Sequence, residues 1–510
     1  MKNPLVAIPT LAPRLYRSSP ILLMLLLSPL ALAQAPTVTS ISATSGPAAG
    51  GTSVTITGTG FTTNENAVYF GSIPATATCL VQSSTTEICT APAGQGIVSV
   101  SVWNVNGMGY LNASYTYTGS GTVYYVSTTG SDSNSGSSSS PWATLQHAEN
   151  QASAGSTIIV ENGTYQEADS WLNGGSAGSP ITVEAQTKWQ AIIAPTAAQE
   201  AANSDGVIYV NVSYVTVLGL NIKGDSGGNA TEGIKFQYNY DGPTLVGGII
   251  KDSQISSIGL ANCGGGSPIL DGQSNTVIDS NLIYNYGYNS ASCNLYEGIY
   301  INNGSGAIIT NNVIGDSPDE TGISLNFETA TTGFPVNVTI ANNTIFNTGG
   351  NGIYINCTGG VCSGNFVNNN ILYNVGNTTN NASIALVLNG GGSGGSYGAN
   401  TYSNNLIYDS QPTYTASGIT GQSFVNTVAT NPDFVNYTGT NTGDYHITSG
   451  SGAIGVATSM GAPNHDFAGN LRPSPDGLYD IGAYEFSSGT APTTPPPAPN
   501  PPTGLTATVN

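Results

Sequence analysis

Short motifs that recur about every 30 residues constrain the fold of this chain more than any other feature of the sequence. One motif is an asparagine followed by any residue and then an aliphatic residue, and its five copies are spaced 31, 31, 27 and 35 residues apart. The copies are Asn281–Ile283, Asn312–Ile314, Asn343–Ile345, Asn370–Leu372 and Asn405–Ile407. A fixed period of this length is typical of solenoids, in which each repeat packs only on its neighbours.

A second motif runs out of phase with the first and consists of a glycine, alternating aliphatic residues and a terminal amide. Its copies are Gly233–Gln237, Gly298–Asn302, Gly322–Asn326 and Gly352–Asn356. Two short strands per period can bury their apolar faces only by stacking on the next repeat, so the two motifs predict a stack of β-coils. We expect the asparagine of the first motif to form an internal ladder, bonded to its neighbours and to turn backbones.

Both ends of residues 119–487 carry further motifs. Tyr124–Ser127, Gly130–Asn134 and Pro141–Leu145 stand near the start, and Asn464–Arg472 and Asp480–Glu485 stand near the end. With these motifs, the region resembles right-handed parallel β-helix proteins of the pectate-lyase-like superfamily. Its last part is similar to the choice-of-anchor Q segment of bacterial surface proteins. The resemblance implies a fold and a surface location, but this fold supports enzymes, adhesins and inert stalks alike.

Residues 36–118 form a separate unit of short alternating runs between Gly, Pro and Asn turns, which predicts an antiparallel β-sandwich. Ser45–Pro47, Gly50–Thr52, Ile56–Phe61 and Val68–Gly71 stand where IPT/TIG immunoglobulin-like domains have their landmarks, and the unit resembles that family. The predicted fold class is therefore all-β, with a sandwich preceding a β-helix. We expect one helix, at residues 146–153, to cap the open apolar end of the β-helix.

The two termini predict secretion. Residues 1–33 combine a basic flank, the apolar run Ile21–Leu30 and the small-residue site Ala31–Ala33, which is the pattern of a signal peptide. A membrane anchor is the alternative, but the apolar run is shorter than the ~20 residues that span a bilayer. No later segment is long and apolar enough to span.

Residues 488–510 form a Pro-rich tail whose last part resembles the first strand of a fibronectin type III domain. We expect a monomer in the secreted or cell-surface compartment.

The six cysteines fit an oxidising compartment. They fall into the local pairs Cys79 with Cys89, Cys263 with Cys293, and Cys357 with Cys362, and the three His lie far from all of them. Disulfides are therefore favoured over a zinc cluster, with buried free thiols as the alternative.

The balance of charge excludes several classes of partner. The net charge is −20, and beyond residue 33 only five Lys and Arg face 28 Asp and Glu, giving −23. Nucleic acid is excluded as a partner because phosphate binding needs clustered cations. Adhesion to anionic lipid is disfavoured for the same reason.

Outward positions of the second motif predict a binding face. The central residue of each copy and the amides that end the strands are Lys235, Tyr300, Asn302, Ser324, Asn326 and Tyr354. Aromatic rings can stack on sugar rings while amides bond to hydroxyls, so we expect this stripe to bind extracellular polysaccharide. The alternative is an ordinary exposed strand surface.

Acidic residues supply the candidate catalytic and metal sites. Asp316, Asp319 and Glu320 are dense enough to hold calcium in a turn, or to be simply solvated. Glu297 lies one repeat earlier and could pair with Asp319 or Glu320 as the two carboxylates of a glycoside hydrolase. The resemblance also admits a calcium-dependent lyase, but Arg472 is the only Lys or Arg beyond Lys251, so the downstream base of several lyase families is missing. An adhesin or stalk is the third possibility.

Overall fold

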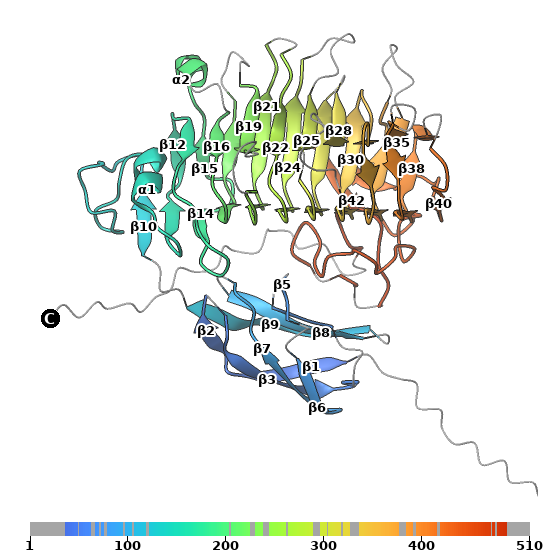
Figure 1. Ribbon diagram of the computed structural model, residues 1–510, viewed down its shortest axis with the longest axis horizontal. Coiled ribbons are helices and arrows are strands. Elements are labelled where there is room, and N and C mark those ends of the chain that lie inside the picture. Colours follow the sequence, from blue (N-terminus) through green and yellow to red (C-terminus); the bar gives the residue numbers. More distant parts are fainter. Residues whose placement is uncertain are drawn as a thin grey trace, which may run out of the picture. The chain divides into compact units, whose positions relative to one another are not determined.

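The computed structural model is built almost entirely of β-strands (Figure 1). It describes residues 36–48, 50–62, 67–70, 73–75, 79–94, 97–104, 107–118, 122–202, 206–224, 230–237, 244–261, 264–288, 296–302, 304–317, 320–326, 336–376, 384–390, 394–415, 419–470, 472–474 and 477–486. The predicted signal peptide, the Pro-rich tail, Cys263, Cys293 and Asp319 lie outside these residues. No helix in the described ranges is long and apolar enough to cross a membrane.

The N-terminal unit is a sandwich of two sheets, as the alternation predicted. One sheet is antiparallel and contains, in spatial order, β1 (Thr37–Ser42), β3 (Ser53–Thr59), β7 (Thr86–Thr90) and β6 (Leu80–Ser83). The other contains β2 (Ser45–Pro47), β9 (Gly107–Thr118), β8 (Ile97–Asn104), β4 (Ala67–Phe70) and β5 (Ile73–Pro74). Val54, Ile56 and Phe70 are buried between them. A disulfide joins Cys79 to Cys89 in this unit.

The second unit is a parallel β-solenoid of three sheets, which confirms the predicted β-helix (Figure 1). The β10 sheet contains β10 (Val123–Val126), β11 (Thr157–Val160), β14 (Ile181–Ala185), β17 (Val215–Leu218), β20 (Ile249–Lys251), β23 (Val277–Asp279), β26 (Ile308–Thr310), β29 (Thr339–Ala341), β33 (Phe366–Asn368), β37 (Thr401–Ser403) and β40 (Phe424–Val425). The β12 sheet contains β12 (Gly163–Tyr165), β15 (Ala191–Ile193), β18 (Asn221–Lys223), β21 (Gln254–Ile258), β24 (Leu282–Tyr286), β27 (Val313–Ser317), β30 (Thr344–Thr348), β34 (Ile371–Tyr373) and β38 (Leu406–Tyr408). The β13 sheet contains β13 (Asp169–Trp171), β16 (Ile208–Val210), β19 (Glu232–Phe236), β22 (Ser267–Asp271), β25 (Glu297–Asn302), β28 (Thr321–Asn326), β31 (Ile353–Asn356), β35 (Ile384–Asn389) and β39 (Gln411–Thr415).

Two short pairs of strands complete the unit: β32 (Val361–Cys362) with β36 (Ser396–Tyr397), and β41 (Phe434–Asn436) with β42 (Asp444–Ile447). Helix α1 (Leu145–Gln151) starts one residue before the predicted helix, and it buries Leu145 and Ala148 in the solenoid core, as expected of a cap. The expectation of a single helix is wrong, because Ala197–Ala202 forms a second helix, α2.

The asparagines of the first motif form the predicted ladder inside the solenoid, at the corner between the β10 and β12 sheets. Nδ2 of each asparagine donates to Oδ1 of the next, over 2.9–3.0 Å, from Asn281 through Asn312, Asn343 and Asn370 to Asn405. Each Oδ1 also accepts the backbone N–H of the asparagine before it. All but Asn405, which is 3% exposed, are fully buried, so these amides replace water as the partners of the corner backbone.

The glycine of the second motif is needed because the interior leaves no room for a side chain. A Cβ at Gly298 would lie 2.7 Å from Cγ2 of Ile314, and one at Gly322 would lie 2.7 Å from Cγ2 of Ile345. These two isoleucines belong to the first motif. The two repeated motifs are therefore complementary, with each glycine accommodating an aliphatic side chain from the opposite wall.

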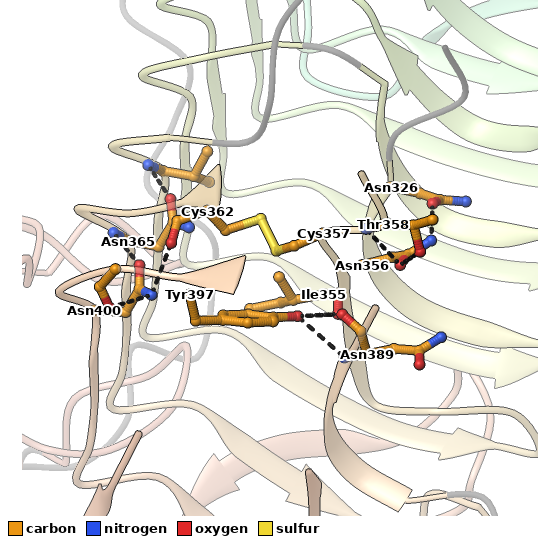
Figure 2. Close-up of a disulfide and its surroundings, with 12 residues drawn as sticks. Asn326, Ile355, Asn356, Cys357, Thr358, Cys362, Asn365, Asn389, Tyr397 and Asn400 are labelled. Carbon is orange, nitrogen blue, oxygen red and sulfur yellow. Dashed lines mark hydrogen bonds between the residues drawn. A yellow bond between two sulfur atoms is a disulfide. The ribbon is translucent and has the colours of Figure 1, made fainter. Parts of the chain in front are cut away.

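A second disulfide lies inside the late coils (Figure 2). Cys357 and Cys362 are fully buried and join the end of β31 to β32. One coil later, Tyr397 pairs in register with Cys362, and its hydroxyl donates to the carbonyl oxygens of Ile355 and Asn389. The disulfide and this tyrosine thus close the same corner in successive coils.

Replacing Asn343 by Ala should lower the free energy of unfolding by about 2–4 kcal/mol, because it leaves the backbone N–H of Asn312 and the carbonyl oxygen of Ile309 without their buried partner. Urea unfolding measures the loss. Asn436→Ala, at an exposed position of β41, is the matched control and should change stability by less than about 0.5 kcal/mol. Equal effects of the two variants would contradict the importance of the ladder.

Asp271 should make stability depend on pH. It is buried among core positions, and burial raises its pKa to about 7. Because the folded-state pKa is raised, its contribution to stability is present below about pH 4 and is lost as the pH rises through about 7. Three pKa units correspond to at most about 4 kcal/mol. Asp271→Asn should therefore gain stability relative to the parent between pH 5 and pH 8 in urea unfolding, and a constant difference would contradict this.

Candidate functional site

The outer face of the β13 sheet carries the predicted stripe. In register, successive strands present the column Tyr209, Lys235, Leu270, Tyr300, Ser324, Tyr354 and Val387. The residues on either side of this column, such as Ile299 and Ile301, are in the solenoid core. The second motif therefore predicted correctly which side chains of these strands point into the core and which point away from it.

Lys235 and Tyr300 are two strands apart, because β22 lies between β19 and β25. The sequence pattern missed this strand, since Pro268 stands where the other strands have glycine and Gly272 stands at the position of the amide. The face is also less open than its polar composition suggested. Lys235 and Tyr354 are half-buried, whereas Tyr300 is 7% exposed and Ser324 is 1% exposed.

The predicted amides form a second row along the end of these strands. Asn302 pairs with Asn326 and Asn356 with Asn389 in register. Asn356 Nδ2 donates to Oδ1 of Asn326 over 2.8 Å, and Asn389 Nδ2 donates to the hydroxyl of Tyr354 over 2.6 Å. The row is therefore held in a fixed orientation beside the tyrosines, which suits recognition of a repeating polar ligand.

Carboxylates lie along the start of the same strands. The Lys235 ammonium is 3.7 Å from Glu232 and 5.9 Å from the centroid of the Tyr209 ring. Glu297 Oε2 accepts a long bond of 3.4 Å from the hydroxyl of Ser267. The face thus combines aromatic, amide and carboxylate groups, with one lysine among them.

The acidic segment is divided by the structure. Asp316 belongs to β27 of the β12 sheet. Burial is the main reason that the pKa of the Tyr445 hydroxyl is raised, and the negative charge of Asp316 raises it further. Glu320 is instead buried, and its Oε2 accepts the backbone N–H of Tyr296 over 3.1 Å. Asp316 is thus half-buried in a strand and Glu320 is buried beside another coil, while Asp319 lies outside the described part of the chain. The calcium site and the catalytic carboxylates Glu297, Asp319 and Glu320 stay predictions.

One cluster in the described ranges brings together three groups that could ligate a metal, namely Cys79, Glu87 and Cys89. Its two sulfurs are joined in a disulfide, so they are not available as thiolate ligands.

Sequence reasoning missed how the C-terminal segment, residues 433–486, covers the late strands of the β12 sheet. Four asparagines directly precede ladder residues, adopt positive φ and point outward: Asn311, Asn342, Asn369 and Asn404. Their Nδ2 groups donate to the carbonyl oxygens of His465, Asp480, Thr458 and Val456, respectively. The repeated Asn-Asn doublet was the signal in the sequence, since asparagine is among the side chains that tolerate this backbone conformation best.

A charged network ties the same segment to earlier coils. Asp279 Oδ2 lies 2.7 Å from the Lys251 ammonium and 2.8 Å from His465 Nε2. Burial opposes ionisation of Asp279, but Lys251 and His465 hold its pKa well below the usual range. His465 thus links the C-terminal segment to the earlier coil that carries Asp279.

Arg472 forms the centre of the segment. It is fully buried, and it donates to Glu485 Oε1 over 2.5 Å and to the carbonyl oxygens of Asp480 and Gly482. Burial raises the pKa of Glu485 to about 7, although Arg472 opposes this. The arginine therefore serves the packing of the segment rather than an exposed active site.

Arg472→Met should destabilise the protein by about 3–5 kcal/mol, because Glu485 would lose its buried counter-charge. The double variant Arg472→Met/Glu485→Leu removes both charges and should recover part of the loss. Thermal unfolding of the parent and the variants measures this. A double variant less stable than Arg472→Met would contradict a pairwise role.

Comparisons with known proteins give a family match for the N-terminal unit. Residues 36–117 match the IPT/TIG domain. The chain is structurally similar to pectate lyase Pel9A, at 18% identity and a TM-score of 0.45 over 72% of this chain and 96% of that one. It is also similar to an alginate lyase from Paenibacillus sp. str. FPU-7, at 19% identity and a TM-score of 0.39 over 56% of this chain and 95% of that one. These similarities concern the fold and carry no conclusion about activity.

Among curated proteins, the uncharacterized protein YwoF of Bacillus subtilis (strain 168) is 33% identical over 106 residues. This match covers 21% of the present chain and 23% of that protein. The choice-of-anchor Q resemblance of the C-terminal segment stays a prediction.

Proposed function

We propose that this protein is extracytoplasmic and binds polysaccharide along the outer face of the β13 sheet. The observation that carries the proposal is the register that aligns Tyr209, Tyr300 and Tyr354 in one column beside a row of asparagine amides. Strands of a sheet are about 4.8 Å apart, so the column offers ring and amide contacts at regular intervals along a straight path. A linear sugar chain presents rings and hydroxyls in the same regular way.

The two disulfides support a location outside the cytoplasm. The net charge of −23 beyond residue 33 would repel a uronate polymer from the carboxylate-bearing β13 face, so such a ligand would need a bridging cation there. A neutral polysaccharide would need none. Cleavage of the bound chain, by elimination or hydrolysis, is a further step that Glu297, Asp319 or Glu320 would have to support.

Tyr354→Ala should weaken binding of a polysaccharide by about tenfold, because its ring is half-buried and therefore more accessible than that of Tyr300 in the same column, which is 7% exposed. Tyr354→Phe keeps the ring and loses the hydroxyl that bonds to Asn389, so it should bind nearly as well as the parent. Affinity electrophoresis against a panel of neutral and acidic polysaccharides measures both. If neither variant changes any binding, the β13 face is not the ligand face.

Unsaturated uronides and reducing ends, assayed in the same mixtures, distinguish a lyase or hydrolase from a binding protein or stalk.

Calcium should raise the melting temperature if the acidic segment holds it, since a ligand of the folded form alone stabilises that form. Asp319→Asn is the informative variant and should remove the calcium effect. Glu320 is less suitable because its carboxylate is buried against Tyr296, so its loss would disturb packing. A melting temperature that is the same in calcium and in chelator would rule the site out.

A further inference from the structure

The early strands of the β12 sheet and the corner that precedes β15 carry a second, chemically different surface, which we call the early β12 face. Its residues are Lys188, Trp189, Asn221, Lys223, Gln254 and Tyr284. All are half-buried or exposed. Asn221 pairs in register with Gln254, and Lys223, Ser256 and Tyr284 occupy successive strands of one column. The late strands of the same sheet instead bury Val313, Phe346 and Ile371 against the C-terminal segment.

Trp189 forms an aromatic platform at the edge of this face, where its half-buried ring lies against Phe467 of the C-terminal segment, with 6.5 Å between the ring centroids. It has a φ of 65°, which is strained for a bulky side chain, and it occupies the same corner as the outward asparagines of later coils. Its backbone N–H donates to Gly219 O, and its Nε1 reaches Asp252 O over 2.7 Å, one coil further on. The indole therefore extends along the stack of coils, across a corner that has glycine in the coil between.

Lysines gather here in a strongly acidic protein, although two of them are paired with aspartates. Lys188 is 41% exposed, with its ammonium 5.0 Å from the Trp189 ring centroid, 5.4 Å from that of Phe467 and 2.8 Å from Asp252. Lys223 is exposed on β18, and Lys251 lies at the adjoining corner, paired with Asp279. These three lysines are a majority of the five Lys and Arg that follow residue 33.

The amide and hydroxyl groups of the face are already oriented. Gln254 Nε2 donates to the Tyr284 hydroxyl over 2.8 Å, and Asn221 lies beside Gln254 on the adjacent strand. Aromatic platform, amides and exposed ammonium groups together match the rings, hydroxyls and carboxylates of an acidic saccharide. Carboxylates lie beside lysines on both faces, but Lys188 and Lys223 are exposed, whereas Lys235 of the β13 face is half-buried.

We propose that the early β12 face binds a uronate-bearing saccharide directly, without a bridging cation. Lys188 and Lys223 contact the sugar carboxylates, and Trp189 and Tyr284 contact the rings. Charge complementarity selects this ligand, because a carboxylate is attracted to these lysines and repelled by the rest of the protein. The inference goes beyond the binding proposed for the β13 face and does not depend on it.

The test uses the full-length protein, an oligogalacturonate and its fully methyl-esterified form, in chelator so that calcium-bridged binding is absent. Isothermal titration calorimetry should show binding of the charged oligomer that weakens with salt, and much weaker binding of the ester. Lys188→Gln/Lys223→Gln should reduce the affinity for the charged oligomer by at least about tenfold. Lys188→Arg/Lys223→Arg keeps the charges and should bind within about threefold of the parent.

Two further variants separate this inference from the function proposed for the β13 face. Lys235→Gln removes one positive charge from the β13 face and is the control for charge. If Lys235→Gln abolished binding of the charged oligomer while Lys188→Gln/Lys223→Gln did not, the inference would be overturned. Equal binding of ester and acid, no binding of the acid by the parent, or an unchanged affinity of the double glutamine variant would also overturn it. If Tyr354→Ala affects no ligand while the lysine variants do, the β13 proposal fails and this one stands.

Discussion

The buried hydrogen bonds between asparagines are the interaction on which the solenoid depends. Each coil turns sharply between the β10 and β12 sheets, and the ladder supplies bonding partners for the backbone groups that this corner would leave unpaired. The bond from one amide to the next also fixes the register between coils, since a slip of one residue would break every rung. Core packing at Ile314 and Ile345, and the glycines opposite them, then follow from that register.

With the coils held in register, the β13 sheet and the early and late strands of the β12 sheet have different outer surfaces. The late β12 strands bear apolar residues and outward asparagines that dock the C-terminal segment. The β13 strands bear tyrosines, amides and carboxylates. The early β12 strands bear Lys223, amides and Tyr284, next to Lys188 and Trp189 at the corner before β15. A single backbone path thus places chemically distinct columns on separate surfaces, because an outward position keeps its alignment from coil to coil.

The repeats made the fold predictable, because two motifs in a fixed phase admit few arrangements other than stacked coils. They also gave the correct facing of Tyr300, Ser324 and Tyr354. They could not give the burial of Ser324 or Glu320, which depends on neighbours that are distant in sequence. The strand Ser267–Asp271 escaped notice because it lacks the glycine, and the docking role of the Asn-Asn doublets became apparent only with the partner carbonyls of the C-terminal segment in place.

The outward asparagines have a consequence for how a protein of this kind can change in length. Asn311, Asn342, Asn369 and Asn404 bond to points of the C-terminal segment that are fixed by the segment's own fold around Arg472. The spacing of these bonds along the segment therefore matches the spacing of the late coils. Adding or removing a coil there would displace the asparagines from the carbonyl oxygens to which they donate. Coils ahead of Asn311 contact the segment through Lys251 and Asp279 at His465, and through Lys188 and Trp189 at Phe467. Variation in coil number among relatives should accordingly be concentrated towards the α1 end, where the solenoid can lengthen without breaking its contacts with the C-terminal segment.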